Sequence, residues 1–204
     1  TATGNFTGTF SGSGAVQITA GTYTVGAAGA NWNFPAGRLV WTGGSMATSG
    51  GGVLTIASGS GLIINSAGNI NVSANITNQG SVVLVSGAFN VQATFSFTNA
   101  GSFDVAIAGT PLNSSGTIIN TGLFKKSTNV GGTTISNPFN NLGGTIDVQA
   151  GTLTLSGAGT HTGGTYNVSG TALQLNNSIT ATGNFTGTFS GSGAVQITAG
   201  TYTV

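Results

Sequence analysis

The sequence predicts an all-β fold, a parallel β-solenoid with about 21 residues in each rung. Three observations support this prediction: two nested repeats, an almost chargeless composition rich in Gly, and short runs in which apolar and polar residues alternate. A fixed repeat period is typical of chains that bury their core by stacking neighbouring units. Alternation with a period of two indicates strands, as in Phe103-Asp-Val105 and Ile146-Asp-Val148.

The longer repeat is exact, and it starts again at Thr180. The opening segment TATGNFTGTFSGSGAVQITAGTYTV (1–25) recurs without change at 180–204. We therefore interpret residues 1–179 as one tandem repeat unit and residues 180–204 as the start of the next identical unit.

The shorter repeat returns about every 21 residues. The pattern apolar-x-Asn-x-Gly recurs at 76–80, 97–101, 118–122 and 139–143, and between these landmarks the chain carries short alternating runs. A unit of this length with two or three strands fits one coil of a parallel solenoid. We expect eight or nine rungs in each repeat, and an advance of about 40 Å at ~4.8 Å per rung. The spacing loosens over residues 1–55.

Three columns follow from this spacing. Apolar residues one rung apart are expected to stack as core, and the Asn residues to form a hydrogen-bonded ladder of amides. The alternative for Asn is that it tolerates a left-handed turn before Gly. The core stack is Ile76, Phe97, Ile118 and Phe139; the ladder is Asn78, Asn99, Asn120 and Asn141; the turn glycines are Gly59, Gly80, Gly101, Gly122, Gly143 and Gly164.

The chain has very little charge. Lys and Arg number three, Asp and Glu two, and the net charge is +1. No basic patch is available for nucleic acid, so no nucleic-acid partner is expected. No apolar run approaches the ~20 residues that a membrane-spanning helix needs. The absence of Cys excludes disulfides.

Three of the charges fall at equivalent outward positions. Asp104, Lys125 and Asp147 are predicted to form a surface ion-pair column, which we prefer to a cation or carbohydrate site. Exposed pairs of this kind stabilise by about 1 kcal/mol or less. Strict alternation turns Lys126 inward, and we expect the following loop to release it to solvent. His161 aligns with Thr77 and is expected to be solvated.

Catalysis is not expected. Two Asp, no Glu and one His do not supply the positioned acid–base pair that polysaccharide cleavage needs. No second His, Cys or Glu completes a metal site, and the Gly-rich runs lack the following helix of a phosphate-binding loop, so no metal and no cofactor are predicted. The chain is therefore not expected to be an enzyme.

Two features suggest binding surfaces. Trp32 and Trp41 are the two indoles, and an exposed Trp often stacks on sugar rings, although packing beside Phe34 is the preferred interpretation. Thr-x-Thr pairs such as Thr22 and Thr24 raise ice binding as a minor alternative, but they do not recur at the spacing of the shorter repeat.

The rungs resemble a known class of surface proteins. The stretch FNNLGGTIDVQAGTLTLSGAGTHTGGTYNVSG (139–170) and the earlier copies of its motif are similar to large bacterial proteins of the filamentous-haemagglutinin and autotransporter-passenger type. The resemblance implies a right-handed β-helix that is secreted to the cell surface and serves adhesion, biofilm or surface architecture.

These observations predict a structural role. Each end of a solenoid leaves a row of unpaired backbone groups, which is a template for further strands. We expect a repeat of an extracellular bacterial or archaeal filament, with identical repeats as partners end to end and filaments bundling laterally. The alternative is an adhesin or carbohydrate-binding module with glycans as partners.

Overall fold

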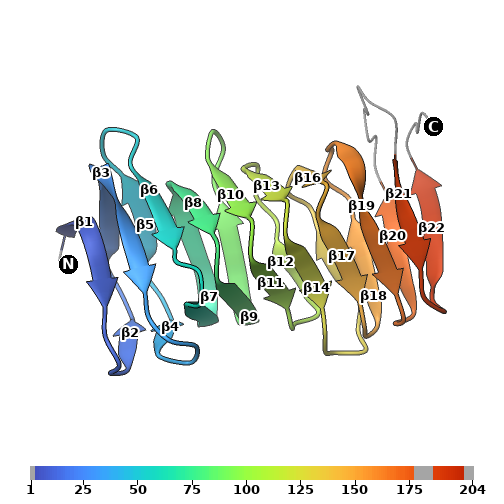
Figure 1. Ribbon diagram of the computed structural model, residues 1–204, viewed down its shortest axis with the longest axis horizontal. Coiled ribbons are helices and arrows are strands. Elements are labelled where there is room, and N and C mark those ends of the chain that lie inside the picture. The colour runs from blue at the N-terminus through green and yellow to red at the C-terminus, as the bar shows by residue number, and fades with distance from the viewer. Residues whose placement is uncertain (1–2, 177–185, 200–204) are drawn as a thin grey trace.

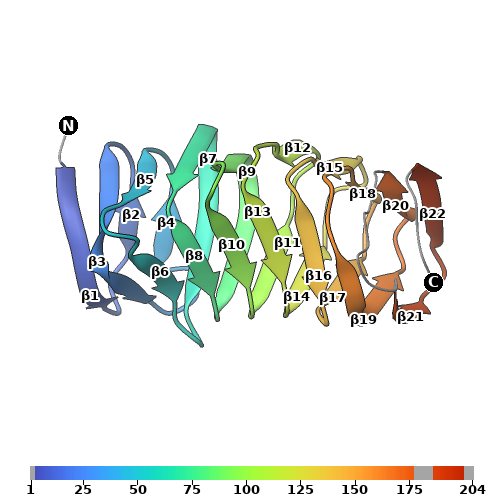
Figure 2. The same cartoon turned by 90° about the horizontal axis from the view of Figure 1, so that it is seen from above.

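The strands follow one another in sequence order along an elongated molecule (Figures 1 and 2). The computed structural model describes residues 3–176 and 186–199, and these residues contain strands and no helix. Pairing between the named strands is parallel, and each interior strand lies between its counterparts one coil earlier and one coil later. The predicted parallel β-solenoid is confirmed.

Each coil, here called a rung, carries up to three short strands, and the stacked rungs form three faces. Five longer strands bend from one face onto the next, for example β1, whose register shifts between Phe6 and Gly8. The three faces are called A, B and C in the order in which the chain meets them from residue 8.

Face A is built from eight successive strands within the described residues. They are β1 (Thr3–Ser11, from residue 8), β3 (Thr22–Asn33, from residue 30), β6 (Val53–Ile56), β8 (Asn75–Asn78), β10 (Ser96–Asn99), β13 (Thr117–Asn120), β16 (Phe139–Leu142) and β19 (His161–Val168, first residues).

Face B follows face A in every rung. Its strands are β2 (Val16–Ile18), β4 (Leu39–Trp41), β7 (Gly61–Ser73, to residue 64), β9 (Ser81–Val91, to residue 84), β11 (Ser102–Val105), β14 (Leu123–Lys126), β17 (Thr145–Val148), β19 from residue 165 and β21 (Thr186–Ser190).

Face C completes the rung. It holds the first residues of β1 and β3, then β5 (Ser45–Thr48), the last residues of β7 and β9, β12 (Gly109–Leu112), β15 (Thr133–Ile135), β18 (Thr152–Leu155), β20 (Ala172–Asn176) and β22 (Ala194–Ala199). Between β9 and β12 this face changes from one hydrogen-bonded sheet to another.

The core is one continuous column along the axis. The expected core stack pairs in register, and its members are at most 1% exposed. Aromatic side chains from all three faces interleave along the axis at centroid distances between 4.9 and 6.3 Å, mostly edge to face. Trp32 and Trp41 belong to this column and are 3% and 0% exposed, so they pack inside and do not form a sugar-stacking surface.

The loosened amino-terminal spacing comes from longer corners. On face A, Thr9 pairs with Asn31, and Asn31 pairs with Thr55, so both of these rungs are longer than the rungs that carry the Asn series. The strands keep their inward and outward positions through the longer rungs. Extra residues are therefore accommodated where the chain turns.

Candidate assembly interface

A ladder of buried amides runs through four rungs of face A. Asn78 Nδ2 donates to Asn99 Oδ1 at 2.8 Å, Asn99 to Asn120 at 2.8 Å, and Asn120 to Asn141 at 2.7 Å. The second N–H of each donor reaches a backbone carbonyl on the next rung, such as Ser102 O at 2.9 Å. All four side chains are 0% exposed, and none of these Asn has a positive φ. The predicted ladder is confirmed, and the left-handed turn alternative is wrong.

His161 occupies the next inward position after the ladder, contrary to the sequence-based expectation. It pairs with Asn141 and is 1% exposed, whereas the regular spacing had placed it outward. The rung between Asn141 and His161 is one residue shorter than the preceding ones. That single residue moves the side chain from the outer to the inner surface of the strand.

Beyond Asn141 the column holds an imidazole and, beside it, a phenol. His161 Nδ1 lies 3.0 Å from Tyr166 Oη, and both rings are buried. Burial lowers the pKa of His161 from 6.5 to about 4, so the imidazole is neutral at pH 7. Burial also raises the pKa of Tyr166, against a smaller opposing effect of its hydrogen bond with Asn141. Both groups beyond Asn141 are therefore neutral and polar at pH 7.

Four of the six predicted turn glycines lie in a column where the backbone of the preceding rung leaves no room for a side chain. The other two lie one residue away from that column. A Cβ on Gly80, Gly101 or Gly122 would collide with the backbone of the preceding rung. Leu123 pairs with Thr145, so the residue before each is equivalent, and Gly144 takes the place of Gly122. In the same way Gly61 pairs with Ser81, so Ser60 takes the place of Gly80. Gly59 and Gly143 instead have φ of +78° with open space around a Cβ. Gly164 returns to the column because its rung is one residue shorter.

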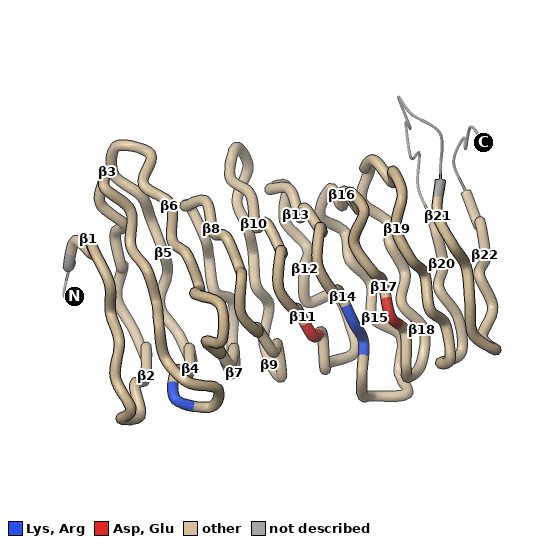
Figure 3. The backbone as a smooth tube through the Cα atoms, viewed as in Figure 1, with Lys and Arg blue, Asp and Glu red and all other residues tan. Residues whose placement is uncertain are grey.

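Figure 3 shows the charged positions of β11, β14 and β17 on successive rungs of face B. This column is less exposed than predicted. Asp104 pairs with Lys125 and Lys125 with Asp147, yet the one ion pair found among the described residues joins Lys125 Nζ to Asp104 Oδ2 at 3.4 Å. Asp104 is only 7% exposed because the chain after β14 covers it. Ser127 donates to its carboxylate from N at 3.1 Å and from Oγ at 2.6 Å. Asp147 instead accepts from Gln149 Nε2 at 2.7 Å.

Lys126 is buried, so the expectation that a loop releases it to solvent is wrong. Its side chain is 0% exposed and follows the inward alternation of β14. Nζ donates to Thr128 O at 2.9 Å and to Asn129 O at 2.5 Å, so the loop folds over the ammonium group. Desolvation lowers the pKa of Lys126, and the charge of Asp104 partly offsets this.

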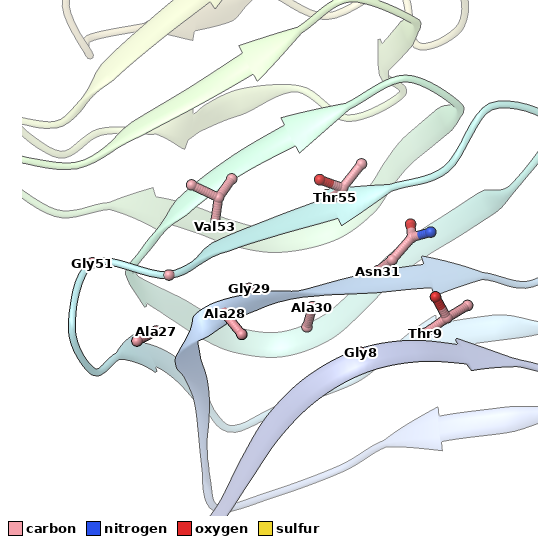
Figure 4. Close-up of a pocket in the computed structure, with 11 residues that line it drawn as sticks. Gly8, Thr9, Ala27, Ala28, Gly29, Ala30, Asn31, Gly51, Val53 and Thr55 are labelled. Atoms are coloured by element: carbon pink, nitrogen blue, oxygen red, sulfur yellow. The ribbon is translucent and has the colours of Figure 1, made fainter.

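An open groove of about 510 Å³ lies on the outside of the first rungs (Figure 4). Small residues of β3 and of the turn before β6 create it, including Ala28, Gly29 and Gly51, and Thr9, Asn31 and Thr55 border it. Its lining contains no acid or base. The groove thus provides polar backbone and Thr side chains, without the groups that general acid–base chemistry needs.

The amino-terminal end of the solenoid opens onto the core. A second, mainly apolar hollow of about 140 Å³ lies among inward side chains of the first two rungs, including Phe6, Phe10, Ile18 and Trp32. Ile18 is nonetheless only 6% exposed, because the next rung covers it with Trp41, its partner in register.

The carboxyl-terminal end presents copies of the same residues with no later rung among the described residues. Phe189 and Ile197 are the second copies of Phe10 and Ile18, and they are 44% and 59% exposed. Phe189 stacks on Tyr166 of the preceding rung at 4.9 Å. Ile197 pairs in register with Leu175 of the preceding rung, and more than half of its own surface is exposed at this end.

Searches for a relative, a metal cluster and a membrane span gave no further candidate within the described part of the chain. No family model, no curated protein and no solved structure matches the chain. Over residues 3–176 and 186–199, no cluster of three His, Cys, Asp or Glu is placed to hold a metal ion. Within the same ranges no helix is long and apolar enough to cross a membrane. The two ends of the solenoid are therefore the candidate interface.

Proposed function

We propose that the chain is a structural repeat of an extracellular filament, in which rungs continue from one repeat into the next. The observation that carries the proposal is the contrast between Ile18 and Ile197. The same residue of the duplicated segment is 6% exposed where a following rung covers it and 59% exposed where the described residues include no following rung. A following rung of the repeat's own sequence is the natural cover for the second copy.

The aromatic column supports this continuation. It runs without a gap from Trp32 to Phe189, each ring within 6.3 Å of the next. Phe10, the first copy of Phe189, pairs in register with Trp32 on the next rung. A repeat that follows Phe189 in the same way would bring its own Trp beside that ring and extend the column.

The backbone at the ends supports the same arrangement. The last described strands of faces B and C, β21 and β22, pair on one side only, with β19 and β20. In a continuing solenoid, the next parallel strands would pair along the other edges of these two strands. A nearly chargeless surface of Ser, Thr, Asn and Gly offers little repulsion to lateral bundling.

The alternatives have weaker support. An adhesin that stacks sugars on Trp loses its two candidate residues, since both are buried. Ice binding needs flat, regular Thr rows, and the outward face A column of Thr9, Asn31, Thr55, Thr77 and Thr98 changes to Ile119.

Electron microscopy with fibre diffraction tests the proposal. We expect filaments with a meridional reflection at about 4.8 Å from the strand spacing and an axial repeat of about 40 Å from the unit 1–179. Discrete particles without axial periodicity, under the conditions in which the protein occurs, would refute the filament. Denaturing electrophoresis then separates two forms of it: separate subunits would enter the gel near the chain's 19.8 kDa, and one long polypeptide would not.

A further inference from the structure

The two copies of the duplicated sequence lie on different faces of the solenoid. In the first copy, Phe10 is on face A and pairs with Trp32. In the second copy, its equivalent Phe189 pairs with Tyr166, which belongs to the face B column of Ile146 and Phe124.

The following strand shows the same shift. In the first copy, Val16–Ile18 lies on face B and pairs with Leu39–Trp41. In the second copy, residues 195–197 lie on face C and pair with residues 173–175 of β20. Two strands of the duplicated segment thus move together by one face.

We infer that the repeat unit 1–179 comprises eight rungs and one additional face, so that each repeat is turned by about a third of a revolution relative to the one before. Face A has eight strands from β1 to β19. β21, the copy of the first, begins beside Thr162 at the end of face A, and its residues 188–190 occupy the ninth rung on face B.

The length of the unit agrees with this count. Spread over eight and one third rungs, the unit 1–179 gives about 21.5 residues per rung, close to the spacing of the Asn ladder. Eight whole rungs would need about 22.4 residues each, and nine would need about 19.9 residues each. The intermediate count is therefore the one that fits the regular rungs best.

The shift is compatible with the local chemistry of the duplicated sequence. Its strands are short and alternate, and short alternating strands occur on all three faces. Phe10 packs against the core from face A, with Phe6 at 5.0 Å, and Phe189 joins the aromatic column from face B, against Tyr166 at 4.9 Å. Inward and outward positions are therefore kept when the segment changes face.

The consequence for a filament rests on the proposed function. Three repeats would bring the sequence back to its starting face after 25 rungs, about 120 Å along the axis at ~4.8 Å per rung. The column of Asp104, Lys125 and Asp147 would then appear on each face in turn, and a lateral partner would meet the same surface feature in three directions around the fibre.

Cysteine pairs in the full chain test the face assignment without any filament. The chain has no Cys, so each pair reports alone. Gln174 and Gln196 are neighbours on face C, with Nε2 of the first 2.9 Å from Oε1 of the second. In-register parallel strands lie about 4.8 Å apart, within the Cα distances that a disulfide spans. If the second copy instead kept the faces of the first, Gln196 would take the position of Gln17 on face B, beside Asn167.

Three double variants separate the two arrangements after oxidation with diamide and counting of free thiols by mass spectrometry. T154C/Q174C is the positive control, because these residues are neighbours on face C in both arrangements. We expect Q174C/Q196C to lose both thiols as completely as the control, and N167C/Q196C to keep both. A disulfide in N167C/Q196C, or none in Q174C/Q196C while the control forms one, would overturn the one-face shift.

Diffraction from filaments provides an independent measurement. With the shift, a layer line at about 120 Å accompanies the axial repeat of about 40 Å, whereas without it the shorter repeat stands alone. Absence of filaments would contradict the proposed function and leave the cysteine result standing. A disulfide in N167C/Q196C, found together with filaments that show only the shorter repeat, would contradict only the shift.

Discussion

Asn141 and His161 pair in register across adjacent rungs, so an imidazole takes the inward position that follows the amide ladder. Both side chains are almost completely buried, and Nδ1 of the imidazole lies 3.0 Å from the hydroxyl oxygen of Tyr166. An uncharged His can occupy this place, whereas an imidazolium would bring a charge into the core, which is costly. The ladder therefore makes the solenoid sensitive to acid at one point.

We expect the stability of the protein to fall between pH 6.5 and 4. The pKa of His161 is about 4 in the folded chain and 6.5 in the unfolded chain, so the unfolded state binds a proton first as pH falls. The contribution of the neutral imidazole to the free energy of unfolding is complete above pH 6.5. It decreases toward pH 4, by about 3 kcal/mol in total. Urea unfolding followed by circular dichroism at several pH values measures it.

The control for this prediction is His161→Gln, which keeps a neutral polar group. His161 is the single His of the chain, so the difference between the two unfolding free energies isolates its titration. A difference that stays constant from pH 7.5 to 4 would show that the imidazole is protonated without cost in the folded state.

Removal of one amide from the middle of the ladder should destabilise strongly. Asn99 accepts from Asn78 and donates to Asn120 Oδ1 and to Leu123 O. Asn99→Ala leaves these buried groups without partners, at about 1–3 kcal/mol for each unsatisfied group. Asn69→Ala, on an exposed side chain, should change the unfolding free energy by less than about 0.5 kcal/mol. Equal effects of the two variants in chemical denaturation would contradict the ladder's structural role.

Gly122 and Gly143 should respond very differently to Ala, although both belong to the glycine series of the shorter repeat. A Cβ on Gly122 would strike the backbone of Ala100 and Gly101, which cannot move without breaking the rung beneath. Gly143 has open space, and only its φ of +78° opposes a side chain. We expect Gly143→Ala to cost about 1–2 kcal/mol, and Gly122→Ala to cost clearly more. Thermal unfolding of both variants provides the comparison, and a larger loss for Gly143→Ala would reverse the assignment of the column.

The limits of sequence reasoning are visible at these same residues. Four copies of one motif at equal intervals were sufficient to predict the solenoid, the amide ladder and the core stack, because stacked rungs require identical environments at a fixed spacing. The errors at Gly59, Gly143 and His161 have one cause: the rungs are not all of one length, and a change of one residue exchanges inside and outside. The turn of the second copy by one face could not be predicted either, since it depends on the sum of all rung lengths in the repeat.

Lys126 differs from the sequence-based expectation for another reason, which is that the fold satisfies its buried charge. The alternation of the strand predicts an inward side chain, and the cost of burying a charge predicts that the loop exposes the ammonium group to solvent. Instead, Thr128 O and Asn129 O accept hydrogen bonds from the ammonium group inside the fold. Burial lowers its pKa below the ordinary 10.5, so the folded chain loses the proton before the unfolded chain does. The charged form is therefore the less favourable one in the folded state, and the unfolding free energy should rise as pH increases toward 10.5.

Lys126→Met removes this titration while keeping an unbranched side chain of similar length. At neutral pH we expect a change within about 1 kcal/mol, because replacing a buried charge by an apolar group removes both its hydrogen bonds and its desolvation. The loop that covers the ammonium group should loosen, since Thr128 and Asn129 lose their common donor. Hydrogen exchange resolved over residues 127–132 and urea unfolding at pH 7 and 10 measure both effects. If the wild type gains no stability over Lys126→Met between these pH values, the lysine carries its charge in the folded protein at no more cost than in water.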